Sequence, residues 1–281
     1  MSGARLPNFV FLGPDKTGST WLHAALSRHP LVYLAPGKDL HFFDRYFDRG
    51  VEWYAAQFRG AGPRHRIVGE IGTRYLYARR AAERIHRTVP DARLMVCVRD
   101  PVKRAFSSFL YLRRQGKNVG TFAEVLDTTP VILDRCRYAT HLQQYLSRFG
   151  QDRIYLGVFD DLQKDPQRYL DGVTTWLSLD PIGLPPEILK PQLPASQARS
   201  RRLGRFVSRT ARKARNRGLT LAVTRVKDSA VVQRTLYRPL AEDRPQLTAQ
   251  DAERIRAELD PEIRRLEELF GVDLRQRWGW A

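Results

Sequence analysis

A cation, a glycine and several hydroxyl groups occur together in the segment from Lys16 to Trp21, directly after an apolar run. The run Asn8–Leu12 is typical of a short buried strand, and Ser19 or Thr20 can cap a helix that follows it. A strand, a tight loop and a helix start point backbone N–H groups and the helix dipole at an anion. A Walker loop places its lysine immediately after its second glycine, whereas this lysine comes two residues before the glycine. The segment therefore predicts a phosphate-binding loop of another type.

A second anion-binding position is indicated at the end of the clearest predicted strand, Arg93–Val98. Arg99 follows this strand and offers a forked guanidinium to a phosphate. Pro101 suits the first turn of a helix, which we expect to run to about Arg114. Ser107 would lie on the second turn of that helix, within reach of the same phosphate. Ligands of open α/β sheets bind at the carboxyl ends of the strands, so both motifs fall on one predicted edge.

A carboxylate and an imidazole, Asp39 and His41, follow another short predicted strand, Val32–Leu34. In an extended segment, residues two apart project to the same face, so both side chains could approach one hydroxyl. A base that takes a proton from an attacking group contributes typically ~10²–10⁴-fold to the rate. Either side chain could serve as such a base. If neither is catalytic, His41 is an orienting or core residue and Asp39 caps a loop, and Phe42 and Phe43 are interpreted as packing residues.

Strands that alternate with helices predict the elements that position these residues. Beyond those already given, we expect strands at Ile67–Glu70 and Arg153–Val158, and helices at Val51–Phe58, Tyr77–Arg87, Arg137–Arg148, Pro166–Leu177 and Leu247–Phe270. The alternation predicts a three-layer α/β fold with a central parallel sheet and helices on both faces. Residues 181–194 are interpreted as a loop. We expect a single domain over residues 1–281, with a basic helical insert at about 196–240 that includes a helix over Arg202–Arg217.

Hydrophobic residues make up 42% of the chain, which is enough to build a proper core. No apolar run approaches the ~18–20 residues that span a bilayer, and Met1 to Pro7 contain no apolar signal-peptide stretch. The two cysteines, Cys97 and Cys136, lack the spacing of metal ligands, and Cys97 is expected to be a buried structural thiol. These features predict a cytoplasmic protein whose cysteines are reduced and which has no metal site.

The net charge of +18 predicts attraction to anions. Thirteen Lys or Arg residues and one acid, Asp228, lie between residues 199 and 238, which leaves a net charge of +6 for the rest of the chain. This basic stretch is interpreted as a flap that binds the acceptor, as a surface that contacts acidic lipid at the inner membrane face, or as a solvated structural helix. We do not expect nucleic-acid binding, because no recognition motif accompanies the charge.

The segment from Lys16 to Leu22 resembles the 5′-phosphosulfate loop of sulfotransferases that use 3′-phosphoadenosine 5′-phosphosulfate (PAPS), which commonly reads Lys-Ser-Gly-Thr-Thr-Trp-Leu. The segment from Arg99 to Ser107 resembles the 3′-phosphate motif of the same family. In that family the lysine contacts the phosphosulfate near its bridging oxygen, and the small hydroxylated residues bind the 5′-phosphate. A cation at this position stabilises the charge that develops as the S–O bond breaks.

The segment from Lys38 to Asp44 resembles the Lys-Glu-x-His-Phe-Phe-Asp segment of heparan sulfate and related bacterial sulfotransferases, with aspartate in place of the presumed glutamate base. On this resemblance we favour Asp39 as the base, with His41 as the alternative. Gly69 to Tyr75 is similar to the Glu-Lys-Thr-Pro-x-Tyr stretch, but Ile71 replaces the lysine that serves anionic saccharides. Ser196 to Arg202 occupies the place of a basic loop that closes over the nucleotide. The resemblance assigns catalysis to Lys16, Asp39 and His41, and nucleotide binding to Lys16, Thr17, Gly18, Ser19, Thr20, Trp21, Arg99, Ser107, Arg199 and Arg201.

The resemblance implies an enzyme that moves a sulfuryl group from PAPS, as co-substrate, to a hydroxyl or amine by in-line displacement. The acceptor would be a small molecule or a glycan, such as a saccharide, a glycolipid or a secondary metabolite. Two other classes compete with this interpretation. A kinase would share the sheet edge but needs the Walker lysine, and a non-catalytic basic module would explain the charge but not Lys16, Arg99 and Ser107.

Overall fold

A computed structural model describes residues 5–115, 120–189, 196–198, 237–239 and 245–280. The chain divides into two compact units, Met1–Arg99 with Tyr138–Gln192, and Asp100–Arg137 with Leu193–Ala281. The organisation as a single domain stays a prediction. The predicted helix over 202–217 lies outside the described residues. Among the helices that are described, none is both long and apolar enough to cross a membrane.

The first unit is built on a five-stranded sheet with the order β2-β3-β1-β4-β5. Its strands are β1 (Phe9–Gly13), β2 (Val32–Leu34), β3 (Ile67–Ile71), β4 (Arg93–Val98) and β5 (Ile154–Val158). All four neighbouring pairs are parallel, and Phe9 in the central strand pairs with Gly69 on one side and Arg93 on the other. Every residue of β1 is buried, as expected for a strand covered on both faces.

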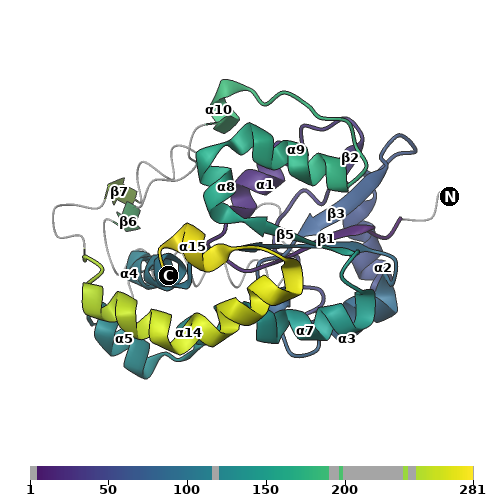
Figure 1. The fold of residues 1–281 in the computed structure, drawn as a ribbon. Coiled ribbons are helices and arrows are strands. Elements are labelled where there is room, and N and C mark those ends of the chain that lie inside the picture. The colour runs from purple at the N-terminus through teal and green to yellow at the C-terminus, as the bar shows by residue number, and fades with distance from the viewer. Residues whose placement is uncertain (1–4, 116–119, 190–195, 199–236, 240–244, 281) are drawn as a thin grey trace. The chain divides into compact units, whose positions relative to one another are not determined.

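Helices cover both faces of this sheet (Figure 1). One face carries α1 (Ser19–Leu26), α8 (Phe159–Lys164), α9 (Pro166–Trp176) and α10 (Pro186–Leu189), and the other carries α2 (Gly50–Ala55), α3 (Ala81–Thr88) and α7 (Tyr138–Phe149). The 3₁₀ helices are η1 (Phe47–Arg49), η2 (Ala56–Phe58) and η3 (Tyr75–Tyr77). Side chains alternate between the faces of a strand, so Phe9 and Phe11 join the core under α1 and α9, while Val10 and Leu12 point to the opposite side. The predicted three-layer α/β fold is confirmed.

The second unit contains α4 (Pro101–Arg114), α5 (Phe122–Thr128), α6 (Val131–Asp134), α14 (Ala249–Phe270) and α15 (Leu274–Trp278), with two short antiparallel strands, β6 (Ser196–Ala198) and β7 (Tyr237–Pro239). Helix α4 begins as predicted, because Asp100 caps it by accepting the N–H of Val102 at 3.0 Å. Arg104 is fully buried, and its guanidinium lies 3.4 Å from both the Ile132 carbonyl oxygen and Cys136 Sγ.

Two local expectations are wrong. Residues 181–194 are not loop throughout, because α10 forms at Pro186–Leu189. The N-cap of α1 is Gly18 rather than Ser19 or Thr20, and no side chain caps this helix. Gly18 makes the change of direction in a left-handed conformation, with φ 85°, which glycine adopts without steric cost.

Candidate active site

The loop between β1 and α1 lies close to two other segments of the first unit, and its two glycines permit this. A Cβ atom at Gly13 would lie 2.8 Å from the backbone oxygen of Thr73. A Cβ atom at Gly18 would lie 2.5 Å from Cδ2 of Leu162 in α8. Such distances are well inside van der Waals contact, so only glycine lets the loop lie this close. The loop is therefore fixed beside Thr73, at the carboxyl end of β3.

Arg99 lies against the same loop. Its Nη1 donates a hydrogen bond to the Lys16 carbonyl oxygen at 3.1 Å, and its guanidinium lies 4.7 Å from the centre of the Phe159 ring. The Tyr138 hydroxyl donates to the Arg99 carbonyl oxygen at 2.8 Å. The structure thus brings together the lysine loop after β1 and the arginine after β4, at the carboxyl edge of the parallel sheet.

The hydroxylated residues of the loop divide into two sets. Thr17 is buried and donates to the Pro14 carbonyl oxygen at 2.7 Å, so its side chain closes the turn of the loop. Ser19 and Thr20 instead accept hydrogen bonds from the ammonium of Lys38, at 3.4 and 2.6 Å. Trp21 belongs to the core, where its indole N–H donates to the Ile188 carbonyl oxygen at 2.8 Å.

Lys38 is a candidate functional residue that the sequence analysis did not single out. Its ammonium lies at the start of α1, where the candidate phosphate-binding loop ends and the helix dipole favours negative charge. The available signal was its place directly before Asp39 in the segment that resembles the family pattern. The contact itself connects residues 18 positions apart, and no local spacing rule reveals such a contact.

The segment that carries Asp39 and His41 is not extended, which corrects the expectation that these side chains share one face of a strand. Both residues have left-handed backbone, with φ of 56° and 57°. The Asp39 N–H donates to the Ile71 carbonyl oxygen at 2.9 Å, which ties the segment to the end of β3. Its side-chain Oδ1 accepts from Thr73, at 2.9 Å from the backbone N–H and 2.6 Å from the hydroxyl.

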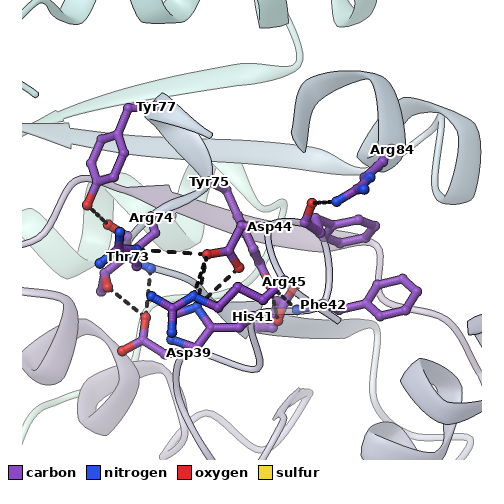
Figure 2. Close-up of polar contacts among 12 residues, drawn as sticks. Asp39, His41, Phe42, Asp44, Arg45, Thr73, Arg74, Tyr75, Tyr77 and Arg84 are labelled. Carbon is purple, nitrogen blue, oxygen red and sulfur yellow. Dashed lines mark hydrogen bonds and ion pairs between the residues drawn. The ribbon is translucent and has the colours of Figure 1, made fainter. Parts of the chain in front are cut away.

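His41 is held by a carboxylate three residues later (Figure 2). Its Nδ1 lies 3.1 and 3.2 Å from the two oxygens of Asp44, and both side chains are about nine-tenths buried. Asp44 also forms ion pairs with Nε of Arg45 at 3.6 Å and Nε of Arg74 at 3.8 Å. An Nδ1–H that donates to a carboxylate fixes the imidazole tautomer and leaves Nε2 as the basic nitrogen. The pair has the base–orienter arrangement of a proton-transfer site.

Behind this segment, the carboxyl group of Glu70 in β3 is fully buried. Burial raises its pKa to about 8, and the nearby Asp39 and Asp44 act in the same direction, while hydrogen bonds from Tyr54 and Tyr75 oppose the shift. Phe42 is buried and stacks on Tyr54, with ring centres 4.3 Å apart and an interplanar angle of 7°. The prediction that Phe42 and Phe43 are packing residues is confirmed.

The other residues that the sequence analysis singled out lie outside this group of contacts. Ser107 lies half-buried in α4, which belongs to the second unit. Arg199 and Arg201 lie outside the described residues. Cys97 is buried as predicted, and burial raises the pKa of its thiol to about 12, so it stays protonated. In the ranges that the structure describes, no three His, Cys, Asp or Glu side chains group as metal ligands do.

A cavity of about 300 Å³ lies at the opposite edge of the sheet from the phosphate loop. Its lining comes from residues at or before the amino ends of β1, β3 and β4 and from the chain after α9: Asn8, Arg66, Ile67, Asp91, Arg93, Leu177 and Ser178. Ligands of open parallel sheets bind at the carboxyl ends of the strands, so we do not assign this cavity to the candidate site.

The parallel sheet, the uncapped helix start and the arginine at the end of β4 define an α/β protein with a candidate anion-binding edge. Residues 6–185 match a family described as Sulfotransferase domain. This match covers more than half of the 281 residues, so the chain belongs to the sulfotransferase family.

Individual relatives agree with this assignment. Human heparan sulfate glucosamine 3-O-sulfotransferase 3B1 is 32% identical over 194 residues, which cover 64% of this chain and 48% of that protein. Membrane-associated sulfotransferase kil1 of Dictyostelium discoideum is 33% identical over 106 residues, or 37% of this chain and 22% of that protein. The crystal structure of a sulfotransferase from Alicyclobacillus acidocaldarius is similar, with a TM-score of 0.57 and 26% identity over 66% of this chain and 88% of that chain. The chain spans less than half the length of these two curated relatives.

Proposed function

We propose that the chain transfers a sulfuryl group from PAPS to a hydroxyl or amine of an acceptor. The observation that carries this proposal is the hydrogen bond from Arg99 to the Lys16 carbonyl oxygen, which brings the arginine after β4 against the lysine-bearing loop that leads into α1. Two cations and a helix N-terminus at one sheet edge favour a ligand that carries more than one anionic group. Membership of the sulfotransferase family supports PAPS as that ligand.

The phosphate loop holds the 5′ end of the nucleotide in this proposal. Backbone N–H groups from Gly18 to Trp21 face the 5′-phosphate at the uncapped start of α1, and the Ser19 and Thr20 hydroxyls bind it together with Lys38. Lys16 stabilises the charge on the phosphate as it leaves. Arg99 takes the 3′-phosphate, and the resemblance adds Ser107, Arg199 and Arg201 to the nucleotide-binding set.

The acceptor side supplies the base. The acceptor oxygen or nitrogen attacks sulfur, the bond between sulfur and the bridging oxygen breaks, and the acceptor proton passes to the protein. Asp39 is our candidate for this base, because Thr73 binds its Oδ1 and orients the carboxylate. His41 is the alternative, supported by its contact with Asp44.

The name of a relative and one difference from the family's sequence pattern indicate the class of acceptor. The human relative is named for a heparan sulfate glucosamine, which favours a saccharide acceptor here. Ile71 replaces the lysine that would serve a heparin-like chain, and this favours a less acidic acceptor, such as a glycolipid or a secondary metabolite.

We also propose that the chain works in the cytoplasm, in peripheral contact with acidic lipid at the inner membrane face. The basic stretch over 199–238 supports this contact, and a relative is named as membrane-associated. Nucleic acid is not proposed as a partner.

Calorimetry with 3′-phosphoadenosine 5′-phosphate (PAP) tests the nucleotide site. Arg99→Ala should weaken PAP binding by about 1.5–3 kcal/mol, the contribution of a charged hydrogen bond. Arg93→Ala is the matched control, because Arg93 begins the same strand at the opposite edge of the sheet and contacts Trp176 instead. Equal PAP affinity in both variants would remove Arg99 from the site. ATP turnover without PAPS turnover would favour a kinase instead.

Labelled PAPS tests the reaction and identifies the acceptor. Incubation with a lysate of the source organism should give a labelled product, and its identification names the acceptor class. Lys16→Ala should reduce turnover more than it reduces PAP affinity, because the lysine acts on charge that develops in the transition state. Equal losses in turnover and affinity would contradict this role.

A further inference from the structure

Glu70 is a buried acid that the proposed reaction does not use. Its Oε1 accepts from the Tyr54 hydroxyl at 2.8 Å, and its Oε2 accepts from the Tyr75 hydroxyl at 3.3 Å. The Tyr75 oxygen in turn accepts the backbone N–H of Phe42 at 3.1 Å. The Phe42 N–H lies between Asp39 and Asp44 along the chain. A chain of hydrogen bonds therefore runs from the carboxyl end of β3 to the backbone of the segment that carries both candidate bases.

This segment needs support from its surroundings. Asp39 and His41 both adopt left-handed backbone, which is unfavourable for residues other than glycine and persists only where neighbouring structure holds it. The Phe42 N–H follows His41 directly and is buried, so without the Tyr75 oxygen it would lose its acceptor. We propose that Glu70 is a positioning residue, which acts through Tyr75 to fix the backbone that aims Asp39 and His41. This inference rests on the proposed function insofar as those two residues are the candidate bases.

The charge state of Glu70 fits this role. Burial raises the pKa of its carboxyl to about 8, so the group is neutral near pH 7. The titratable groups that face it are Tyr54 from α2, Tyr75 from η3, and Asp39 and Asp44 from the supported segment. A neutral Glu70 adds no negative charge behind the two aspartates, whereas an ionised Glu70 would repel them. Its stabilising contribution is therefore greatest at low pH and is lost as the pH rises through about 8.

Two tyrosine variants form a matched pair for the test. Tyr75→Phe removes the hydroxyl that links Glu70 to Phe42, while Tyr54→Phe removes an equally buried hydroxyl from the other oxygen and leaves that link in place. The rate is measured as release of labelled sulfate from PAPS, with water in place of the acceptor. We expect Tyr75→Phe to lower kcat by about 10–100-fold with PAP affinity unchanged, since small misplacements of a reacting group have effects of this size. Tyr54→Phe should change kcat by less than about threefold. Equal rates in the two variants would overturn the inference.

Glu70→Gln provides a test that does not depend on the folding of Tyr75→Phe. The amide keeps the planar shape of the carboxyl group and cannot ionise, and its oxygen can accept from one tyrosine hydroxyl while its nitrogen donates to the other. The variant should match the wild-type rate near neutral pH and keep that rate above about pH 8, where the wild type declines. Identical pH profiles for the two proteins would count against the inference.

The NMR signals of the His41 ring separate this inference from the proposed function. Tyr75→Phe should shift them and Tyr54→Phe should not, whether or not PAPS is a substrate. If the wild type neither binds PAP nor releases sulfate, the proposed function fails, and the ring signals still decide the positioning role. His41 signals that are unchanged in Tyr75→Phe would overturn it.

Discussion

Left-handed backbone at non-glycine residues is concentrated at the candidate site. Among the described residues it occurs at Lys16, Asp39, His41 and Ser178, and the first three are the candidate catalytic residues. Each such conformation costs of the order of ~1–3 kcal/mol and tends to persist where function requires a particular side-chain direction. The coincidence supports the assignment of these residues independently of the sequence motifs.

At the scale of single residues, a substitution of Lys38 tests whether its ammonium binds the nucleotide. Its ammonium lies 2.6 Å from the Thr20 hydroxyl, so Lys38→Met removes a cation from the start of α1. PAP affinity should fall by about 1.5–3 kcal/mol in calorimetry, as expected for loss of a charged hydrogen bond. Lys164→Met, an exposed lysine at the end of α8, is the control and should bind PAP normally. Normal affinity in Lys38→Met would assign Lys38 a role in holding the loop only.

The choice of base can be decided by two substitutions that each remove one candidate basic group. Asp39→Asn keeps the acceptor oxygen that Thr73 binds but removes the basic group, so turnover should fall by ~10²–10⁴-fold if Asp39 is the base. His41→Asn should then have the smaller effect. Rates are measured under conditions where PAPS is saturating. The reverse order of losses would assign proton transfer to the pair of His41 and Asp44.

At the scale of elements, the sequence predicts best where a local signal exists. The bounds of β2 and β4 agree with the prediction because both are apolar runs, and α4 begins at Pro101 after its Asp100 cap. Helix α5 was missed although Thr121 and Glu124 form a capping box, a signal that was present. Helix α8 carries no such signal, since its N-cap is Val158, the last residue of β5.

The candidate site likewise contains residues that the sequence locates correctly and contacts that it does not predict. The phosphate loop and Arg99 follow predicted strands, so the rule for parallel sheets locates both at one edge. The contacts of Lys38 with Thr20 and of Asp39 with Thr73 join distant parts of the chain, and the sequence does not predict them. The extended form expected for residues 39–41 was wrong, because tertiary hydrogen bonds hold a backbone conformation that aspartate and histidine seldom adopt.

Gly18 joins the loop to α1, and its replacement tests this junction. Gly18→Ala introduces a Cβ at left-handed φ and 2.5 Å from Leu162, so we expect a loss of about 1–3 kcal/mol of unfolding free energy and weaker PAP binding. Gly183→Ala is the control, since its Cβ would meet no atom within 4 Å. The double variant with Leu162→Ala should recover the part of the loss due to the clash. Denaturant unfolding and calorimetry measure both effects, and equal stability of the two glycine variants would contradict the account of this junction.

At the scale of the whole molecule, the charge is unevenly distributed along the chain. Residues 199–238 carry most of the net +18, and the sulfotransferase motifs lie almost entirely outside them. Attraction to an acidic lipid surface amounts to about 1 kcal/mol for each Lys or Arg near it and is screened by salt. The proposed membrane contact and the proposed nucleotide site should therefore be separable.

A variant in which every Lys and Arg from 202 to 238 is replaced by Gln tests this separation, because it keeps Arg199 and Arg201 for the nucleotide. The wild type should sediment with vesicles that contain phosphatidylserine and remain in solution with neutral phosphatidylcholine vesicles. The affinity of the variant for the acidic vesicles should fall by at least about tenfold. A tenfold loss corresponds to ~1.4 kcal/mol of binding free energy, which is little more than the contribution of one Lys or Arg near the lipid surface. Its affinity for PAP should be unchanged. If acidic vesicles bind both proteins equally, the contact with lipid does not depend on this stretch; if PAP affinity falls together with vesicle binding, the stretch serves the nucleotide instead.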